Sequence, residues 1–121
     1  MNWLFVIIVV AALAVFFLFK HFGQISANDA QALLKNGALI VDVRTPGEYN
    51  SGHLANAINI PLDEIEETLP RHVKDRSEAL LLHCQSGMRS GIARKKLKAL
   101  GYTRACNLGS YQRAAQIVGR G

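Results

Sequence analysis

Cys84 stands where an apolar run gives way to small and polar residues, in the stretch LLHCQSGMRSG from Leu81 to Gly91. A cysteine at such a junction is either a nucleophile held in a loop or a small residue buried at a strand end. If a helix begins near Ser90, its free N–H groups and its dipole point back into the loop. Gly87 permits a backbone conformation that other residues resist, so loop N–H groups can converge on an anion. This field would favour the thiolate form of Cys84.

The loop after Cys84 is therefore the candidate anion-binding site. Its members are Gln85, Ser86, Gly87, Met88, Arg89 and Ser90. Gln85, Ser86 and Met88 are expected to line the entrance, while Arg89 either holds the loop through carbonyls or a carboxylate, or faces the substrate. His83 is adjacent to Cys84, but neighbouring side chains in a strand point to opposite faces, which argues against a Cys–His pair.

Arg44 follows a second apolar run and is the other basic residue expected at a strand end. It either binds an anionic substrate at the pocket mouth or forms a structural ion pair with Asp42 or Glu48. Asp42 is expected to support the junction of loop and sheet rather than to transfer protons. A buried core role is expected for Cys106, with a resolving thiol for Cys84 as the alternative. No Cys/His cluster has the spacing of a zinc site, so neither a metal nor a cofactor is expected.

The elements that would position these residues alternate between strands and helices. Apolar runs typical of strands buried on both faces precede Arg44 and Cys84, and a third short strand is predicted at 103–108. Between the first two strands lie a turn-rich segment and a short extended piece. The predicted helices cover residues 26–37, 62–73, 90–101 and 109–119. This alternation implies an α/β fold, a small parallel sheet flanked by helices, with ligands bound beyond the carboxyl ends of the strands.

Residues 3–19 form an unbroken apolar run without a charge. A helix of this run would span roughly 25 Å, close to the ~30 Å hydrocarbon core of a bilayer. A cleaved secretory signal is the weaker alternative, because no basic residue precedes the run. The expected domains are a transmembrane anchor at 1–20, a connector at 21–24 and a folded domain at 25–121. Lys20 and His21 follow the run, so the positive-inside rule predicts a single-pass protein of the inner (cytoplasmic) membrane with its domain facing the cytoplasm.

The chain is basic, with 14 Lys and Arg against 9 Asp and Glu and a formal charge of +5. A nucleic-acid partner is not expected, because no recognition motif accompanies the charge. Anionic small substrates or an anionic membrane surface fit this modest excess.

Two motifs together carry a family resemblance. The loop CQSGMRS, residues 84–90, resembles the active-site loop of the rhodanese (sulfurtransferase) family. Residues 41–61, VDVRTPGEYNSGHLANAINIP, are similar to the upstream signature of that family, in which His53 belongs to a structural turn. The late NLGS, residues 107–110, resembles its closing loop, with Ser110 in place of the usual second glycine. The resemblance covers about residues 25–119 and implies a rhodanese-like fold with Cys84 as the catalytic residue.

The resemblance also implies a two-step sulfur transfer. The Cys84 thiolate attacks the outer sulfur of a donor such as thiosulfate, sulfite leaves, and the resulting persulfide gives its sulfur to an acceptor. Cyanide in assays, a thiol and a protein sulfur carrier are the expected acceptors or partners. Because Gln85, Ser86 and Met88 are neutral, a persulfide or protein donor suits the loop better than thiosulfate.

Two alternatives from other classes remain. One is a non-catalytic or sulfur-presenting binding module on the same fold. The other is a hydrolase that resembles the cysteine phosphatases, which place five residues between cysteine and arginine. Here four residues separate Cys84 from Arg89, and none of them is an acid, so the loop favours sulfur over phosphate.

Overall fold

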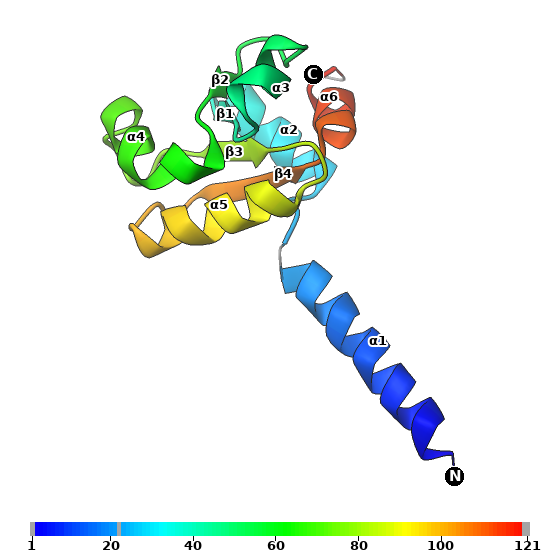
Figure 1. Cartoon of the computed structure of the whole chain (residues 1–121). Helices are drawn as coiled ribbons and strands as arrows, with labels where there is room; N and C mark the ends of the chain where they lie inside the picture. The colour runs from blue at the N-terminus through cyan, green and yellow to red at the C-terminus, as the bar shows by residue number, and fades with distance from the viewer. Residues whose placement is uncertain (1, 22, 120–121) are drawn as a thin grey trace.

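A computed structural model describes residues 2–21 and 23–119, and for residues 18–21 it describes the backbone alone. Four parallel strands form one sheet in the order β2-β1-β3-β4 (Figure 1). The strands are β1 (Leu39–Asp42), β2 (Ile58–Asn59), β3 (Leu80–His83) and β4 (Ala105–Gly109). The predicted α/β fold with a small parallel sheet is confirmed.

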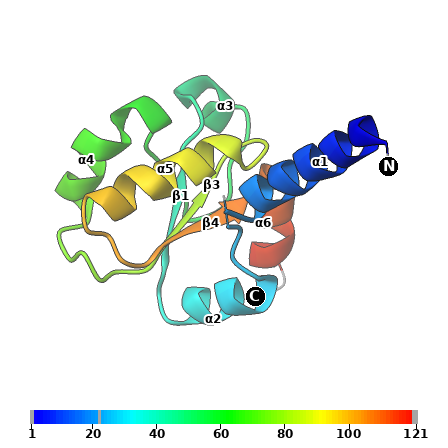
Figure 2. The ribbon, with the colours of Figure 1, turned by 90° about the horizontal axis from the view of Figure 1, so that it is seen from below.

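Helices cover both faces of the sheet (Figures 1 and 2). On one face lie α2 (Ala27–Lys35) and α6 (Tyr111–Gly119), which bury Ala30, Ala114 and Ile117 against it. On the other lie α5 (Met88–Ala99) and α4 (Ile65–His72), the latter preceded by a short 3₁₀ turn, η1 (Leu62–Glu64). Their buried side chains include Leu69 and Leu97. The two central strands, β1 and β3, are thus covered on both faces, as their near-continuous apolar sequences require.

The segment predicted as turns contains a short helix, α3 (Pro46–Asn50). Thr45 caps it: its hydroxyl oxygen accepts a hydrogen bond from the Glu48 N–H at 3.2 Å, and the Glu48 carboxylate accepts one from the Thr45 N–H at 3.1 Å. This reciprocal pair satisfies two N–H groups that the helix start would leave free. Pro46 and Gly47 suggested turns because both residues break regular structure, but proline is also favoured in the first turn of a helix.

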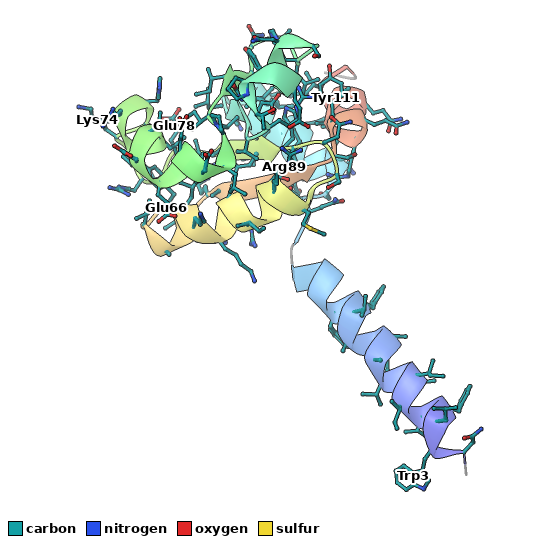
Figure 3. The ribbon with its side chains drawn as sticks, viewed as in Figure 1. Trp3, Glu66, Lys74, Glu78, Arg89 and Tyr111 are labelled. Carbon is teal, nitrogen blue, oxygen red and sulfur yellow. The ribbon has the colours of Figure 1, made fainter. Side chains whose placement is uncertain are left out.

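The N-terminal helix, α1 (Trp3–His21), extends away from the domain (Figures 1 and 3). Most of its described apolar side chains are exposed, among them Trp3, Phe5 and Phe16. Among the residues that the structure describes, however, no helix is both long and apolar enough to cross a membrane. The transmembrane anchor expected at residues 1–20 is therefore not supported.

The connector after α1 joins the edge of the sheet beside β4. Gln24 forms an isolated parallel bridge with Asn107, and the Ile25 N–H donates to the Asn107 carbonyl at 2.9 Å. The Arg113 guanidinium then reaches the Ile25 carbonyl at 2.5 Å. The start of the folded domain is thus tied to the strand that borders the Cys84 loop.

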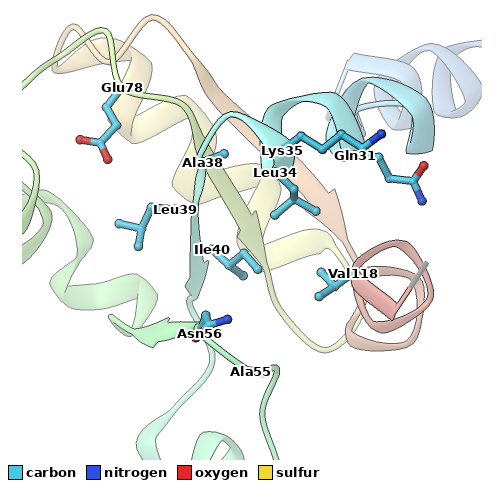
Figure 4. A pocket seen from close by; sticks show the side chains of 11 residues that line it. Gln31, Leu34, Lys35, Ala38, Leu39, Ile40, Ala55, Asn56, Glu78 and Val118 are labelled. Atoms are coloured by element: carbon cyan, nitrogen blue, oxygen red, sulfur yellow. The ribbon is translucent and has the colours of Figure 1, made fainter. Parts of the chain in front are cut away.

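A cavity of about 460 Å³ opens at the amino end of β1 (Figure 4). Its lining includes Lys35, Glu78 and Val118. Cys84 follows the carboxyl end of β3, which runs parallel to β1. The cavity and the candidate site therefore lie at opposite ends of the strands.

Candidate active site

The Cys84 loop connects the carboxyl end of β3 to the first turn of α5. The helix begins at Met88, two residues earlier than the sequence predicted, and Gly87 is its N-cap. The free N–H groups and the positive end of the helix dipole therefore lie inside the loop itself.

Gly87 aims a backbone N–H at the sulfur atom. This N–H donates to Cys84 Sγ at 3.0 Å. Gly87 has φ of +97°, in the left-handed region, and an added Cβ would lie 3.4 Å from Gly109 Cα and 3.2 Å from Gln24 Nε2. Both the conformation and the close approach of β4 thus require glycine here.

The pKa of Cys84 lies below that of an ordinary thiol. Burial raises this pKa, but hydrogen bonds from the Ser90 hydroxyl and from the N–H groups of Ser90, Gly87 and Ser86 lower it further than burial raises it. These donors interact more strongly with a thiolate than with a thiol, so the loop stabilises the anion. The geometry thus provides the activating group that a neighbouring base would otherwise supply.

Asn107 fixes the donors of the loop, although sequence analysis gave it no role beyond the closing motif. This residue of β4 is buried, and its Nδ2 donates to the Gly87 carbonyl at 3.1 Å. Its Oδ1 accepts from the Gly109 N–H at 2.9 Å and contacts Ser90 Oγ at 2.7 Å. Ser90 Oγ also lies 3.1 Å from the Gly87 carbonyl oxygen and 3.6 Å from Cys84 Sγ, so three acceptors compete for one hydroxyl proton.

We expect Asn107→Asp to raise the pKa of Cys84 by about one unit or more. The change removes the donor that holds the Gly87 carbonyl and places a negative charge behind the loop. Ultraviolet absorbance of the thiolate against pH measures this pKa. Asn36→Asp, an exposed site at the end of α2, adds the same charge elsewhere and should leave it unchanged. An unaltered Cys84 pKa in Asn107→Asp would remove Asn107 from the positioning role.

His83 turns away from the reactive sulfur, as the strand geometry predicts. Its ring packs against Tyr111 at 5.8 Å between centroids, whereas Cys84 belongs to the core on the opposite face of the sheet. Burial lowers the pKa of His83, Asp42 and the Cys84 carbonyl raise it, Arg44 lowers it, and the net result is a lowered pKa. His83 is therefore a neutral buried side chain and not the base for Cys84.

Arg44 forms the ion pair with Asp42 that the sequence left as one of two alternatives. Its Nη2 lies 2.7 Å from Asp42 Oδ2, and the two side chains are 5% and 0% exposed. The guanidinium also donates to the Gly52 carbonyl at 2.7 Å and to Gln85 Oε1 at 3.2 Å. With its donors engaged and its surface covered, Arg44 supports the loop through Gln85 rather than offering a free charge to a ligand. Asp42 also accepts a hydrogen bond from the Arg44 N–H at 2.9 Å, and these contacts suit the supporting role expected of it.

Arg89 pairs with Glu48, a residue that sequence analysis considered only as a partner of Arg44. The pair is bidentate: Nη1 lies 2.7 Å from Oε1 and Nη2 lies 3.0 Å from Oε2. Arg89 is at the start of α5, and Glu48 comes from α3 (Figure 3 labels Arg89). The three-residue spacing of Thr45 and Glu48 is that of a capping box, and it was the sequence signal that a helix starts here and fixes Glu48.

The loop exposes some of its residues and buries the cysteine. Gln85, Ser86 and Met88 are exposed, in agreement with their expected place at the entrance. Cys84 itself is 0% exposed. Cys106 is half-buried and packs with the core on the face opposite to Cys84, which argues against a resolving thiol.

The two cysteines should differ in the pH dependence of their alkylation. The loop donors lower the pKa of Cys84, whereas burial raises that of Cys106 despite the nearby Arg94, Lys98 and Arg104. The thiolate is the reactive form, so the midpoint for iodoacetamide should lie at lower pH for Cys84. Peptide mass mapping follows each site, and midpoints rather than plateau rates are compared because Cys84 is buried. The reverse order of midpoints would contradict the electrostatic account of the loop.

The sequence also matches a family of known proteins. The family described as "Rhodanese-like domain" matches residues 26–114. The chain is 39% identical over 69 residues to the thiosulfate sulfurtransferase PspE of Escherichia coli (strain K12), covering 57% of this chain and 66% of that protein. It is 37% identical over 75 residues to a tRNA uridine(34) hydroxylase of Hamiltonella defensa, covering 57% of this chain and 21% of that protein. The chain thus spans less than two thirds of the length of these curated relatives.

Solved structures show the same similarity. The human single-domain sulfurtransferase TSTD1 superposes with a TM-score of 0.66 at 29% identity, over 77% of this chain and 95% of that structure. A structure described as a rhodanese with anions from E. coli gives a TM-score of 0.62 at 35% identity, over 64% of this chain and 91% of that one.

Proposed function

The chain belongs to the rhodanese-like domain family, and we propose that it is a sulfurtransferase that carries sulfur on Cys84 as a persulfide. One observation supports this most directly: the Gly87 N–H donates to Cys84 Sγ at 3.0 Å at the amino end of α5. Donors placed in this way stabilise both the attacking thiolate and the terminal anion of a persulfide.

The reaction has two balanced steps. The Cys84 thiolate forms a bond to the outer sulfur of a donor such as thiosulfate, the donor's S–S bond breaks, and sulfite leaves with the bonding pair. A nucleophilic acceptor then takes the terminal sulfur and returns the thiolate; cyanide gives thiocyanate, and a thiol gives a new persulfide. Such a shuttle has ping-pong kinetics.

Mass spectrometry of the intact chain tests the proposal. After incubation with thiosulfate or a persulfide and removal of the donor, the protein should be one sulfur atom heavier, and cyanide should remove the gain while producing thiocyanate. The same gain is expected in Cys106→Ser, because Cys106 lies on the other face of the sheet. A chain that gains no mass from any donor would instead support the binding module.

A phosphatase-like hydrolase is less well supported. Four residues separate Cys84 from Arg89, and the carboxylate nearest to Arg89 is Glu48, which binds its guanidinium with both oxygens. An ionised carboxylate held in this way has no proton for the leaving group of a phosphate ester. Turnover of p-nitrophenyl phosphate without sulfur transfer would reverse this ranking.

The location at a cytoplasmic membrane stays a prediction, supported by the apolar sequence at residues 3–19. The domain would then meet sulfur donors, thiols or a protein carrier at the membrane surface. Sedimentation of the full chain with membranes, compared with residues 21–121, tests this. Equal amounts of both in the soluble fraction would contradict it.

A further inference from the structure

Among the described residues, Arg89 of the Cys84 loop and Arg44, which contacts the loop through Gln85, are each already paired with a carboxylate of this chain. Arg44 binds Asp42, with 2.7 Å between Nη2 and Oδ2, and Arg89 binds Glu48 through both nitrogens at 2.7 and 3.0 Å. Because a paired charge produces a much weaker field than a free one, the site attracts an anion chiefly through backbone N–H groups.

The Arg89–Glu48 pair is the more exposed of the two. Its side chains are 34% and 32% exposed, whereas those of Arg44 and Asp42 are 5% and 0% exposed. Arg89 belongs to the first turn of α5, just after Gly87, whose N–H faces Cys84 Sγ, and its pKa is raised most by Glu48 and also by Cys84. The charge of Glu48 therefore acts on the same space that a donor anion must enter.

Glu48 is held in place independently of any ligand. Its Oε1 accepts from the Thr45 N–H at 3.1 Å and from the Thr45 hydroxyl at 3.2 Å, so α3 fixes the carboxylate opposite Arg89. The hydrogen bond from Arg89, aided by that from Thr45, holds the pKa of Glu48 at about 2. The carboxylate thus stays ionised at neutral pH.

From this arrangement we infer that Glu48 sets the charge of the donor, so that the site favours sulfane donors with one negative charge over the thiosulfate dianion. The inference rests on the proposed sulfur transfer. A dianion brings a second negative charge into a site where Glu48 has already neutralised the exposed guanidinium. A monoanion needs only the field that the loop N–H groups supply.

Thiosulfate and methanethiosulfonate form a matched pair of donors for the test. In both, the Cys84 thiolate forms a bond to the terminal sulfur while the adjoining S–S bond breaks. Sulfite leaves from thiosulfate and methanesulfinate leaves from methanethiosulfonate, each with the bonding pair. The donors differ by one unit of charge, and neither reaction needs an oxidant or a reductant.

The experiment measures kcat/KM for both donors, with cyanide as acceptor, in the wild type and three variants. Glu48→Gln keeps a side-chain oxygen that can accept the hydrogen bonds from Thr45. In this variant the ratio of kcat/KM for thiosulfate to kcat/KM for methanethiosulfonate should rise about tenfold. Glu48→Asp retains the charge, and Glu67→Gln removes the same charge from an exposed pair with Arg71. Both should leave the ratio within about twofold of the wild type.

The outcomes separate this inference from the proposed function. If both donors form the persulfide but the ratio is unchanged in Glu48→Gln, or rises equally in Glu67→Gln, the role of Glu48 is overturned and the sulfurtransferase proposal stands. No persulfide from either donor would overturn the sulfurtransferase proposal as well. A second measurement uses the wild type and the N-acetylcysteine thiolate in water. The ratio of the second-order rate constant for methanethiosulfonate to that for thiosulfate should be larger for the protein than for the free thiolate. Equal preferences would contradict the inference even if Glu48→Gln did not fold.

Discussion

Cys84→Ser is expected to lose sulfur transfer, with kcat/KM for any sulfane donor at least about 10³-fold below the wild type. Serine fits the buried position, but its hydroxyl is not ionised at neutral pH and its oxygen is a poor nucleophile toward sulfur. The measurements are the mass of the donor-treated chain and the yield of thiocyanate.

The control for this prediction is Cys106→Ser. It makes the same atomic change on the opposite face of the sheet and should keep both the mass gain and the turnover. Circular dichroism checks that each variant folds. A donor-treated Cys84→Ser chain as heavy as the loaded wild type would place the sulfur on another residue and refute the assignment.

Asp42→Asn is expected to lower the free energy of unfolding by about 3–5 kcal/mol. The change leaves the Arg44 guanidinium without its counter-ion, in a position where Arg44 is 4% exposed. The guanidinium would keep its hydrogen bonds to the Gly52 carbonyl and to Gln85. It would lose the carboxylate to which Nε and Nη2 donate through three contacts. Denaturation by urea at neutral pH measures the difference.

Two further variants show whether the loss comes from an unpaired charge. Glu67→Gln breaks an exposed ion pair with Arg71 and should cost less than about 1 kcal/mol. Asp42→Asn combined with Arg44→Gln removes both charges and should be more stable than Asp42→Asn alone. If Asp42→Asn were no more costly than Glu67→Gln, the buried pair would have no part in holding the loop.

The sequence was enough to predict the parallel sheet and the position of Cys84. Leu80 to His83 form part of a near-continuous apolar run, and such runs belong to strands covered on both faces. The alternation of strands and helices then fixed the end of the sheet at which the loop lies. The same strand geometry predicted that His83 faces away from Cys84.

The ion pairs of the site were harder to predict, because they depend on side chains from separate elements. Arg89 and Glu48 are 41 positions apart, and only the folding of the turn-rich segment into α3 brings them together. Asn107 lies 20 positions after Gly87 and reaches the loop because β4 lies beside β3. Local patterns report hydrogen bonds within an element, whereas these contacts follow from tertiary packing.

The complete burial of Cys84 makes access to its sulfur atom a separate step of every reaction. A sulfur atom with no exposed surface reacts only after the loop opens, and each second-order rate constant is multiplied by the fraction of time for which the opening is wide enough for that reactant. Loading by a donor, unloading by an acceptor and damage by peroxide all require this step. Burial thus lengthens the lifetime of bound sulfur, and it slows a bulky reactant more than a small one.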